Sequence, residues 1–180
     1  PAQLEDSLNV WRWMRDNGRS VDINPDHIIA AGDSAGGQMS VALAMTLRDL
    51  GLPQLKAMAL LYPVLGANTE TASYIRNADA PCLTRSEMLF YLQSFLGPKT
   101  SPAWSDEKAL PNLAQNLEGL PPAFITVAGH DPLYDDGVIF HEKLLSAGIA
   151  SELRREPKLA HSYMRARHHS AVAMEAFQAI

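Results

Sequence analysis

The sequence has little cysteine, no long apolar run and no excess of positive charge. Its one cysteine among 180 residues, Cys82, cannot form a disulfide within the chain, and metal sites built on several thiolates are excluded. We expect Cys82 to be a small buried apolar residue. The 15 basic and 20 acidic residues give a net charge of −5, which offers no electrostatic attraction to nucleic acid or to an anionic membrane. No apolar run approaches the roughly 20 residues that span a bilayer.

The composition that remains is typical of a packed globular protein. Hydrophobic residues make up 47% of the chain and charged residues 19%, and the length suits a single domain over residues 1–180. Apolar residues recur at helical spacing over residues 3–17. Beyond that helix, short apolar segments alternate with longer helical patterns. We expect strands at residues 28–31, 56–62, 123–129 and 150–155, and helices at residues 39–50, 85–96, 133–147 and 162–180.

This alternation predicts an α/β fold, with a mostly parallel sheet that is flanked by helices. Prolines punctuate residues 66–121, which contain one clear helix and resemble a lid-like insertion rather than a layer of the sheet. In parallel sheets, ligands bind at the carboxyl ends of the strands. Polar residues that directly follow a predicted strand are therefore the candidates for a functional site.

A candidate nucleophile, Ser34, follows the first predicted strand. Residues 32–36 read Gly-Asp-Ser-Ala-Gly, which matches G-x-S-x-G between a strand and a helix, the setting of a nucleophile elbow. A strained turn there would expose the hydroxyl of Ser34, and the flanking glycines would let neighbouring backbone pass closely. The backbone N–H of Ala35, at the start of the helix, would point at a developing oxyanion. The alternative is a packing turn with an inert serine.

The candidate base is His161, which follows the fourth predicted strand in a short loop, where its imidazole can reach Ser34. The alternative for His161 is a surface-loop histidine. The other histidines precede a strand, lie within predicted helices or, at position 130, adjoin a better candidate for another role. They are His27, His130, His141, His168 and His169.

The candidate orienting carboxylate is Asp131, which follows the third predicted strand, with Asp135 as the alternative. Pro132 fixes the start of the next helix and so holds Asp131 at the strand end. Carboxylates in the first turn of a helix, such as Asp135 and Asp136, are by default partners of the helix dipole or caps. We expect Asp33, directly before Ser34, to support the site without being catalytic.

Together these motifs resemble the hormone-sensitive-lipase branch of the α/β-hydrolases, a family of serine carboxylesterases and lipases. The resemblance rests on GDSAGG at 32–37, LYPVL at 61–65, NADAPCLT at 77–84, LPPAFITVAGHDPLYDDG at 120–137 and LAHSY at 159–163. It implies an α/β-hydrolase fold and a Ser34–Asp131–His161 triad in the chain order of that family. It also implies hydrolysis of short- to medium-chain esters through an acyl-enzyme, without metal or cofactor, and a possible homodimer through the last strand and its flanking helix.

The sequence departs from the family pattern at two places. Ser162 stands where the family usually has glycine after the catalytic histidine, and the upstream His-Gly-Gly-Gly loop has no counterpart. We therefore expect the chain, which begins at Pro1, to lack the N-terminal strands and oxyanion loop of an esterase. Losing one oxyanion donor typically costs ~10²–10³ in kcat. The first predicted strand would also expose an apolar edge, so we expect this chain alone to be poorly soluble or inactive.

The sequence leaves other functions open. A small-molecule-binding module on the same fold is one alternative, although such a receptor would be expected to lack the base. An acyltransferase or amidase would use the same acyl-enzyme and cannot be separated by sequence. No signal peptide is recognisable at the start, and we expect a cytoplasmic location.

Overall fold

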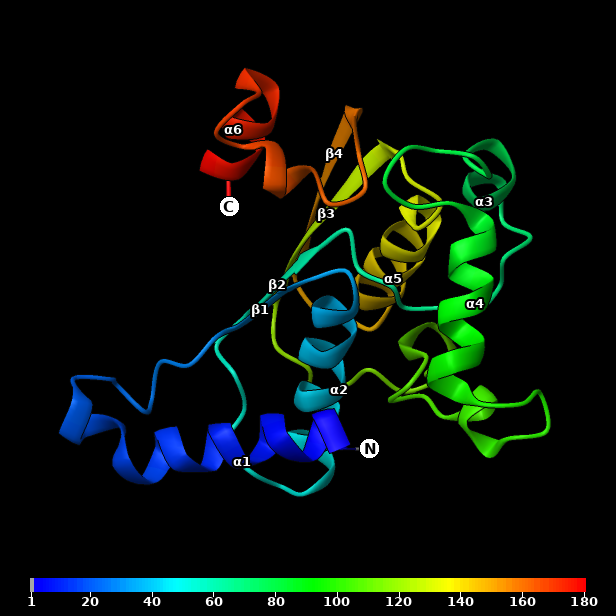
Figure 1. The fold of residues 1–180 in the computed structure, drawn as a ribbon. Helices are drawn as coiled ribbons and strands as arrows, with labels where there is room; N and C mark the ends of the chain where they lie inside the picture. The colour runs from blue at the N-terminus through cyan, green and yellow to red at the C-terminus, as the bar shows by residue number, and fades with distance from the viewer. Residues whose placement is uncertain (1) are drawn as a thin grey trace.

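The computed structural model describes residues 2–180 and contains a four-stranded parallel sheet with helices on both faces (Figure 1). The spatial order is β1-β2-β3-β4, and every neighbouring pair is parallel. The strands are β1 (Ala30–Asp33), β2 (Met58–Leu61), β3 (Ala123–His130) and β4 (Ser151–Ala160). Since parallel strands end on the same side, their carboxyl ends form one edge, and the predicted α/β class is confirmed.

Six α-helices connect or flank these strands. They are α1 (Ala2–Asn17), α2 (Ala35–Asp49), α3 (Ala72–Arg76), α4 (Arg85–Leu96), α5 (Tyr134–Ser146) and α6 (Ala171–Gln178). Short 3₁₀ turns lie at η1 (Gly18–Val21), η2 (Pro102–Ser105), η3 (Pro111–Leu113) and η4 (Tyr163–Ala166). Figure 1 shows α2 and α5 on one face of the sheet and α6 on the other. The predicted helix over residues 85–96 matches α4, which begins with a capping box between Thr84 and Glu87.

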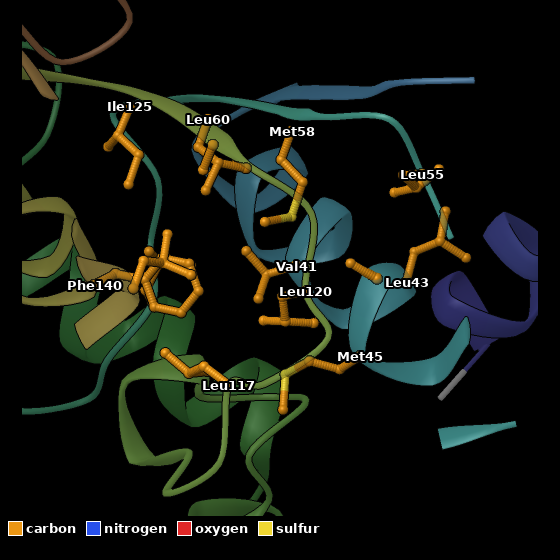
Figure 2. Packing of buried hydrophobic residues seen from close by; sticks show 14 of the residues in the cluster. Val41, Leu43, Met45, Leu55, Met58, Leu60, Leu117, Leu120, Ile125 and Phe140 are labelled. Carbon is orange, nitrogen blue, oxygen red and sulfur yellow. The ribbon is translucent and has the colours of Figure 1, made fainter. Parts of the chain in front are cut away.

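The main hydrophobic core lies between the sheet and helices α2 and α5 (Figure 2). Met58 and Leu60 of β2 are buried on this face, whereas the alternate residues of the strand are only half-buried. Val41 of α2 and Phe140 of α5 pack against the same layer and are fully buried. The alternation along β2 therefore places its larger side chains in the core and orients the sheet relative to α2 and α5.

The segment 66–121 joins β2 to β3 and contains α3, α4, η2 and η3. It has its own apolar cluster, in which residues of α4 pack against Tyr74, Leu110 and Leu133. Figure 1 shows α4 standing beyond α2 and α5, away from the sheet. Ala114, Leu117 and Leu120, near the end of the same segment, belong to the main core, so the segment also contributes to the layer beneath the sheet (Figure 2).

Three predicted element boundaries were wrong. Helix α2 begins at Ala35 rather than at residue 39, and β4 continues to Ala160, so His161 follows the strand directly instead of a loop. The predicted last helix over 162–180 is divided into η4 and α6, and His168 and His169 lie in the turn between them. Residues 167–170 read Arg-His-His-Ser and carry no apolar side chain, so the apolar spacing is interrupted at this turn and the prediction wrongly extended one helix across it.

Cys82 is exposed, contrary to the expectation that it is buried. It lies in the loop before α4 and has a positive φ of 72°. A residue in this tight turn is held by the backbone conformation and does not enter the apolar cluster nearby.

Within residues 2–180, no helix is both long enough and apolar enough to cross a membrane. The same part of the chain contains no group of three or more His, Cys, Asp or Glu side chains that could hold a metal ion.

Candidate active site

Ser34 occupies a strained turn between β1 and α2. Its φ of 55° and ψ of −118° lie outside the regions that side-chain-bearing residues usually adopt. The turn is tight, because a Cβ atom at Gly32 would lie 2.3 Å from the backbone of Gly36, and one at Gly37 would lie 2.6 Å from Pro63 Cβ. Glycine is therefore required at both positions for the chain to turn sharply enough to present the Ser34 hydroxyl.

The backbone around Ser34 is held from the neighbouring strand. The Ser34 N–H donates to the Leu61 carbonyl at 2.9 Å, and the Val64 N–H donates to the Ser34 carbonyl at 3.2 Å. Ala35, the first residue of α2, is exposed, and its N–H donates to no backbone carbonyl within the described chain. This free N–H at a helix start has the position and polarity that an oxyanion donor needs.

His161 lies between Ser34 and Asp131. Its Nε2 is 3.0 Å from Ser34 Oγ, and its Nδ1 is 2.7 Å from Asp131 Oδ2. The imidazole is 5% exposed and the carboxylate is fully buried. Because an ionised Asp131 can only accept, Nδ1 of a neutral His161 carries the proton, which leaves Nε2 as an acceptor for the Ser34 hydroxyl.

An irregularity between β3 and β4 positions His161. Ala128 pairs with Glu156 and His130 with Ala160, so β4 has additional residues over this stretch. A Cβ atom at Gly129 would lie 2.4 Å from the Pro157 carbonyl oxygen, so glycine is needed where the two backbones meet. Pro157 lies within the irregular stretch, where its missing N–H disturbs the ladder least. The irregularity brings the end of β4 toward the end of β3, and thereby His161 toward Asp131.

Asp131 is fixed on both sides of its carboxylate. Its Oδ1 accepts the Leu133 N–H at 2.9 Å, while Oδ2 faces His161. The buried Asn77 donates through Nδ2 to the backbone carbonyls of Asp131, at 2.9 Å, and of Gly129, at 3.3 Å. Asn77 thereby ties the inserted segment to the strand end that carries Asp131.

The alternative carboxylates make other contacts. Asp135 Oδ2 accepts the Ser73 N–H at 2.8 Å and does not contact His161. Asp33 is exposed, and within residues 2–180 its side chain forms no hydrogen bond or ion pair. The negative charge of Asp33 acts on Tyr62. The phenol pKa of Tyr62 is raised above its usual range, mainly by burial and secondly by this charge.

The other five histidines do not reach Ser34. His27 bonds to Asn24 at the surface, and the half-buried His141 bonds to Ser151. The other three are exposed: His130, His168 and His169.

Aromatic rings support the imidazole of His161. The Tyr62 ring lies edge-on to His161 with ring centres 5.0 Å apart, and Tyr163 packs on Tyr62 at the same distance. The Tyr163 hydroxyl donates to Thr126 Oγ1 at 3.0 Å. Burial raises the pKa of Tyr163, so both phenols remain neutral at physiological pH. The imidazole is thus held by packing as well as by its two polar contacts.

A cavity of about 520 Å³ opens beside Ser34. Its walls are mainly apolar and come from α2, from the segment after β2 and from α4, so the inserted segment forms one side of it. The lining residues include Ala35, Met39, Val64, Met88, Tyr91 and Phe95. An apolar compartment of this size next to the Ser34 hydroxyl can hold the hydrocarbon part of a small ligand.

Two structural contributors were not found by the sequence reasoning. Asn77 lies within a segment noted only for its resemblance, and the buried Asp136 was assigned by default to the helix dipole. Instead Asp136 accepts backbone N–H groups from the segment after β2. The NADAP and DPLYDD motifs come together only in the folded chain. The sequence around Asn77 or Asp136 therefore does not indicate which residues each of them contacts.

Comparison with known proteins gives a consistent family. A family model described as alpha/beta hydrolase fold matches residues 1–165. The chain is 39% identical over 168 residues to carboxylesterase NlhH of Mycobacterium tuberculosis, covering 91% of this chain and 52% of that protein. It is 36% identical to esterase LipI of the same organism, with 91% and 51% covered. The chain therefore spans about half the length of the curated relatives it matches.

Solved structures agree with this result. An esterase structure from Rhizomucor miehei superposes with a TM-score of 0.91 at 29% identity, covering 98% of this chain and 55% of that one. A thermostable esterase from Pseudomonas putida gives a TM-score of 0.89 at 29% identity, with 97% and 55% covered. On the evidence of the matched family model, the sequence identities and the shared fold, the chain belongs to the α/β-hydrolase family.

Proposed function

We propose that the chain carries the reacting groups of a serine carboxylic ester hydrolase. The observation that carries this proposal is the continuous contact from Ser34 Oγ through the His161 imidazole to the Asp131 carboxylate. The strained backbone of Ser34 and the neighbouring apolar cavity support it. The naming of its relatives as carboxylesterase and esterase favours ester hydrolysis over binding alone.

In the proposed reaction, His161 Nε2 takes the proton from Ser34 Oγ as the oxygen attacks the ester carbonyl carbon. The Ala35 N–H donates to the oxyanion that develops. Asp131 holds the imidazole in the required tautomer and stabilises the imidazolium. His161 then gives the proton to the departing alcohol, which leaves an acyl group on Ser34. A water molecule, deprotonated by His161, attacks the acyl carbon; the bond to Ser34 Oγ then breaks, His161 returns the proton to Ser34 Oγ, and the acid is released.

The cavity supports short- to medium-chain esters as substrates. Its mainly apolar walls and its volume of about 520 Å³ suit a short hydrocarbon chain better than a charged group. We further propose that segment 66–121 acts as a lid, because α4 forms one wall of this cavity. A homodimer through β4 and α6 stays a prediction, supported by the position of β4 at an edge of the described sheet. The cytoplasmic location also stays a prediction.

The test uses the full-length protein rather than this chain alone, and combines labelling of Ser34 with a fluorophosphonate probe and hydrolysis of p-nitrophenyl esters of increasing acyl length. We expect wild-type protein to be labelled, and Ser34→Ala to lose both the label and at least about 10³-fold in turnover. His161→Ala should lose turnover to a similar extent while the fold is retained. Labelling that persists in Ser34→Ala would show that another residue is the nucleophile. A folded wild type that reacts with neither reagent would favour the binding-module alternative.

A further inference from the structure

Asp136 is a buried carboxylate that takes no part in the proposed reaction. It lies in the first turn of α5 and is 2% exposed. Its Oδ2 accepts two backbone N–H groups, from Leu65 and Gly66, both at 2.8 Å. The next residue, Gly137, lets α5 approach β3 closely, since a Cβ there would lie 2.5 Å from Val127 Cγ1. That approach buries Asp136 between the helix and the segment after β2.

The segment that Asp136 holds is also in contact with Ser34. The Val64 N–H, one residue before the first tethered amide, donates to the Ser34 carbonyl. Pro63 packs so closely on Gly37, in the first turn of α2, that no side chain fits there. Val64 also lines the cavity beside Ser34. The segment 63–66 therefore links the Asp136 carboxylate to both the backbone of Ser34 and the cavity wall.

Asn112 closes the same arrangement from the other side. Its backbone N–H donates to the Leu65 carbonyl at 2.8 Å, and its Nδ2 donates to the Asp136 carbonyl at 3.1 Å. Its own carbonyl accepts from Lys143 Nζ at 2.8 Å. The segment 63–66 is thus fixed by hydrogen bonds from α5 and from η3, and only Asp136 provides an acceptor for two consecutive N–H groups.

The environment makes a carboxylate at this position unfavourable. Burial raises the pKa of Asp136 to about 7, against the lowering effect of the two N–H groups, and the nearby Asp131 and Asp135 raise it further. Tyr74 of α3 faces the same region and is neutral, because burial and the charges of Asp136 and Asp131 raise its pKa. The presence of a carboxylate in this unfavourable environment is explained if its hydrogen bonds to the N–H groups of Leu65 and Gly66 are required.

We propose that Asp136 is a positioning residue, which fixes the backbone of Ser34 by binding the N–H groups of Leu65 and Gly66. The proposal rests on the proposed function, in which Ser34 is the nucleophile. It acts through segment 63–66 and not through contact with the substrate. The positioning role requires an oxygen at residue 136 that accepts these two hydrogen bonds. The uncharged amide oxygen of asparagine meets this requirement as well.

The experiment uses the full-length protein and compares Asp136→Asn, which keeps an acceptor, with Asp136→Ala, which removes it, and with Asp135→Asn as the matched control. The first measurement is amide hydrogen exchange at Leu65 and Gly66, which does not depend on ester hydrolysis. We expect Asp136→Ala to lower protection there about tenfold or more, while both asparagine variants keep it. The second is turnover of a p-nitrophenyl ester. We expect kcat to fall about 10- to 100-fold in Asp136→Ala and to return to within about threefold of wild type in Asp136→Asn.

The outcomes separate the two proposals. Unchanged exchange at Leu65 and Gly66 in a folded Asp136→Ala variant overturns the positioning role, as does unchanged kcat. An Asp136→Asn variant as impaired as Asp136→Ala also overturns it, because the charge would then be what matters. If Asp136→Ala does not fold, Asp136→Ser, which shortens the side chain, replaces it under the same criteria. A wild type without label or turnover refutes the function, and the positioning role with it, even where the exchange result shows the tether.

Discussion

At the scale of single residues, the positions around the proposed site adopt backbone conformations that their side chains do not favour. Ser34, Tyr62 and Ser162 all have positive φ values without being glycine. Strain of this kind persists only where the surrounding structure compensates for it, and it is concentrated at functional sites. For Ser34 the strain presents the hydroxyl. The conformation at position 162 is one that glycine adopts without strain, which explains why the family usually has glycine after the histidine.

Replacing Ser162 with glycine should therefore stabilise the protein. The left-handed conformation, with φ of 59°, costs a side-chain-bearing residue about 1–2 kcal/mol. Glycine avoids this cost, but it loses more conformational entropy on folding, which offsets part of the gain. We expect Ser162→Gly to raise the free energy of unfolding by about 0.5–1 kcal/mol, measured by urea denaturation. The control is Ser94→Gly in the exposed face of α4, which should lower it by about 0.5 kcal/mol. A loss of stability in Ser162→Gly would contradict this account.

At the scale of elements, the turn from β1 to α2 and the irregular pairing of β3 with β4 bring the three site residues together. Ser34 follows β1, Asp131 follows β3 and His161 follows β4, so their convergence depends on the three strands being parallel. The close approaches at Gly32 and Gly129 are what let these strand ends bend toward each other. Each approach leaves no room for a Cβ atom.

The two outer glycines of G-x-S-x-G should differ sharply when replaced. A Cβ atom at Gly32 would lie 2.3 Å from the backbone of Gly36, whereas a Cβ atom at Gly36 would meet nothing within 4 Å. We expect Gly32→Ala to displace the turn and to lose both fluorophosphonate labelling of Ser34 and about 1–3 kcal/mol of stability, the usual cost of overpacking. Gly36→Ala should stay folded and keep its labelling within a few-fold. Equal effects of the two substitutions would rule out the steric explanation.

At the scale of the whole molecule, the sheet has one well-covered face and a less protected edge. Strand β1 is at an end of the described sheet, and Ile29 beside it is 60% exposed. An apolar strand edge of this kind favours association between chains. This supports the expectation that the chain alone is poorly soluble, which stays a prediction.

The stability of the molecule should also depend on pH through Asp136. Its carboxyl pKa is about 7 in the folded protein and 3.8 without the fold, so between these values the folded state holds a proton that the unfolded chain has released. The free energy of unfolding therefore falls as pH rises through this window. A difference of about 3 units corresponds to roughly 4 kcal/mol.

Urea denaturation at pH 4.5 and pH 8 tests this dependence. We expect Asp136→Asn to gain stability relative to wild type as pH rises, since the amide has no charge to bury. Asp135→Asn keeps Asp136, so it serves as the control and should show nearly the same change in stability between the two pH values as wild type. Parallel stability curves for wild type and Asp136→Asn would show that the buried carboxyl does not titrate in this range.

The sequence by itself determined the class of fold and the three proposed reacting residues. The order of strands and helices follows from apolar periodicity, and the positions after β1, β3 and β4 follow from the rule that sites lie at carboxyl ends of parallel strands. Three element boundaries were predicted wrongly. The start of α2 and the length of β4 depend on hydrogen bonds that periodicity does not encode, and the break before α6 falls at a polar stretch across which the helix was extended.

Only the tertiary structure decided which neighbouring carboxylate does what. Asp131, Asp135 and Asp136 lie within six residues, yet one faces His161, one holds the start of α3 and one binds the segment after β2. The reason is physical. Asp131 lies between β3 and α5, whereas Asp135 and Asp136 are successive residues of α5, whose side chains point about 100° apart and so face different elements from distant parts of the chain. Local sequence specifies the directions, and packing specifies the partners.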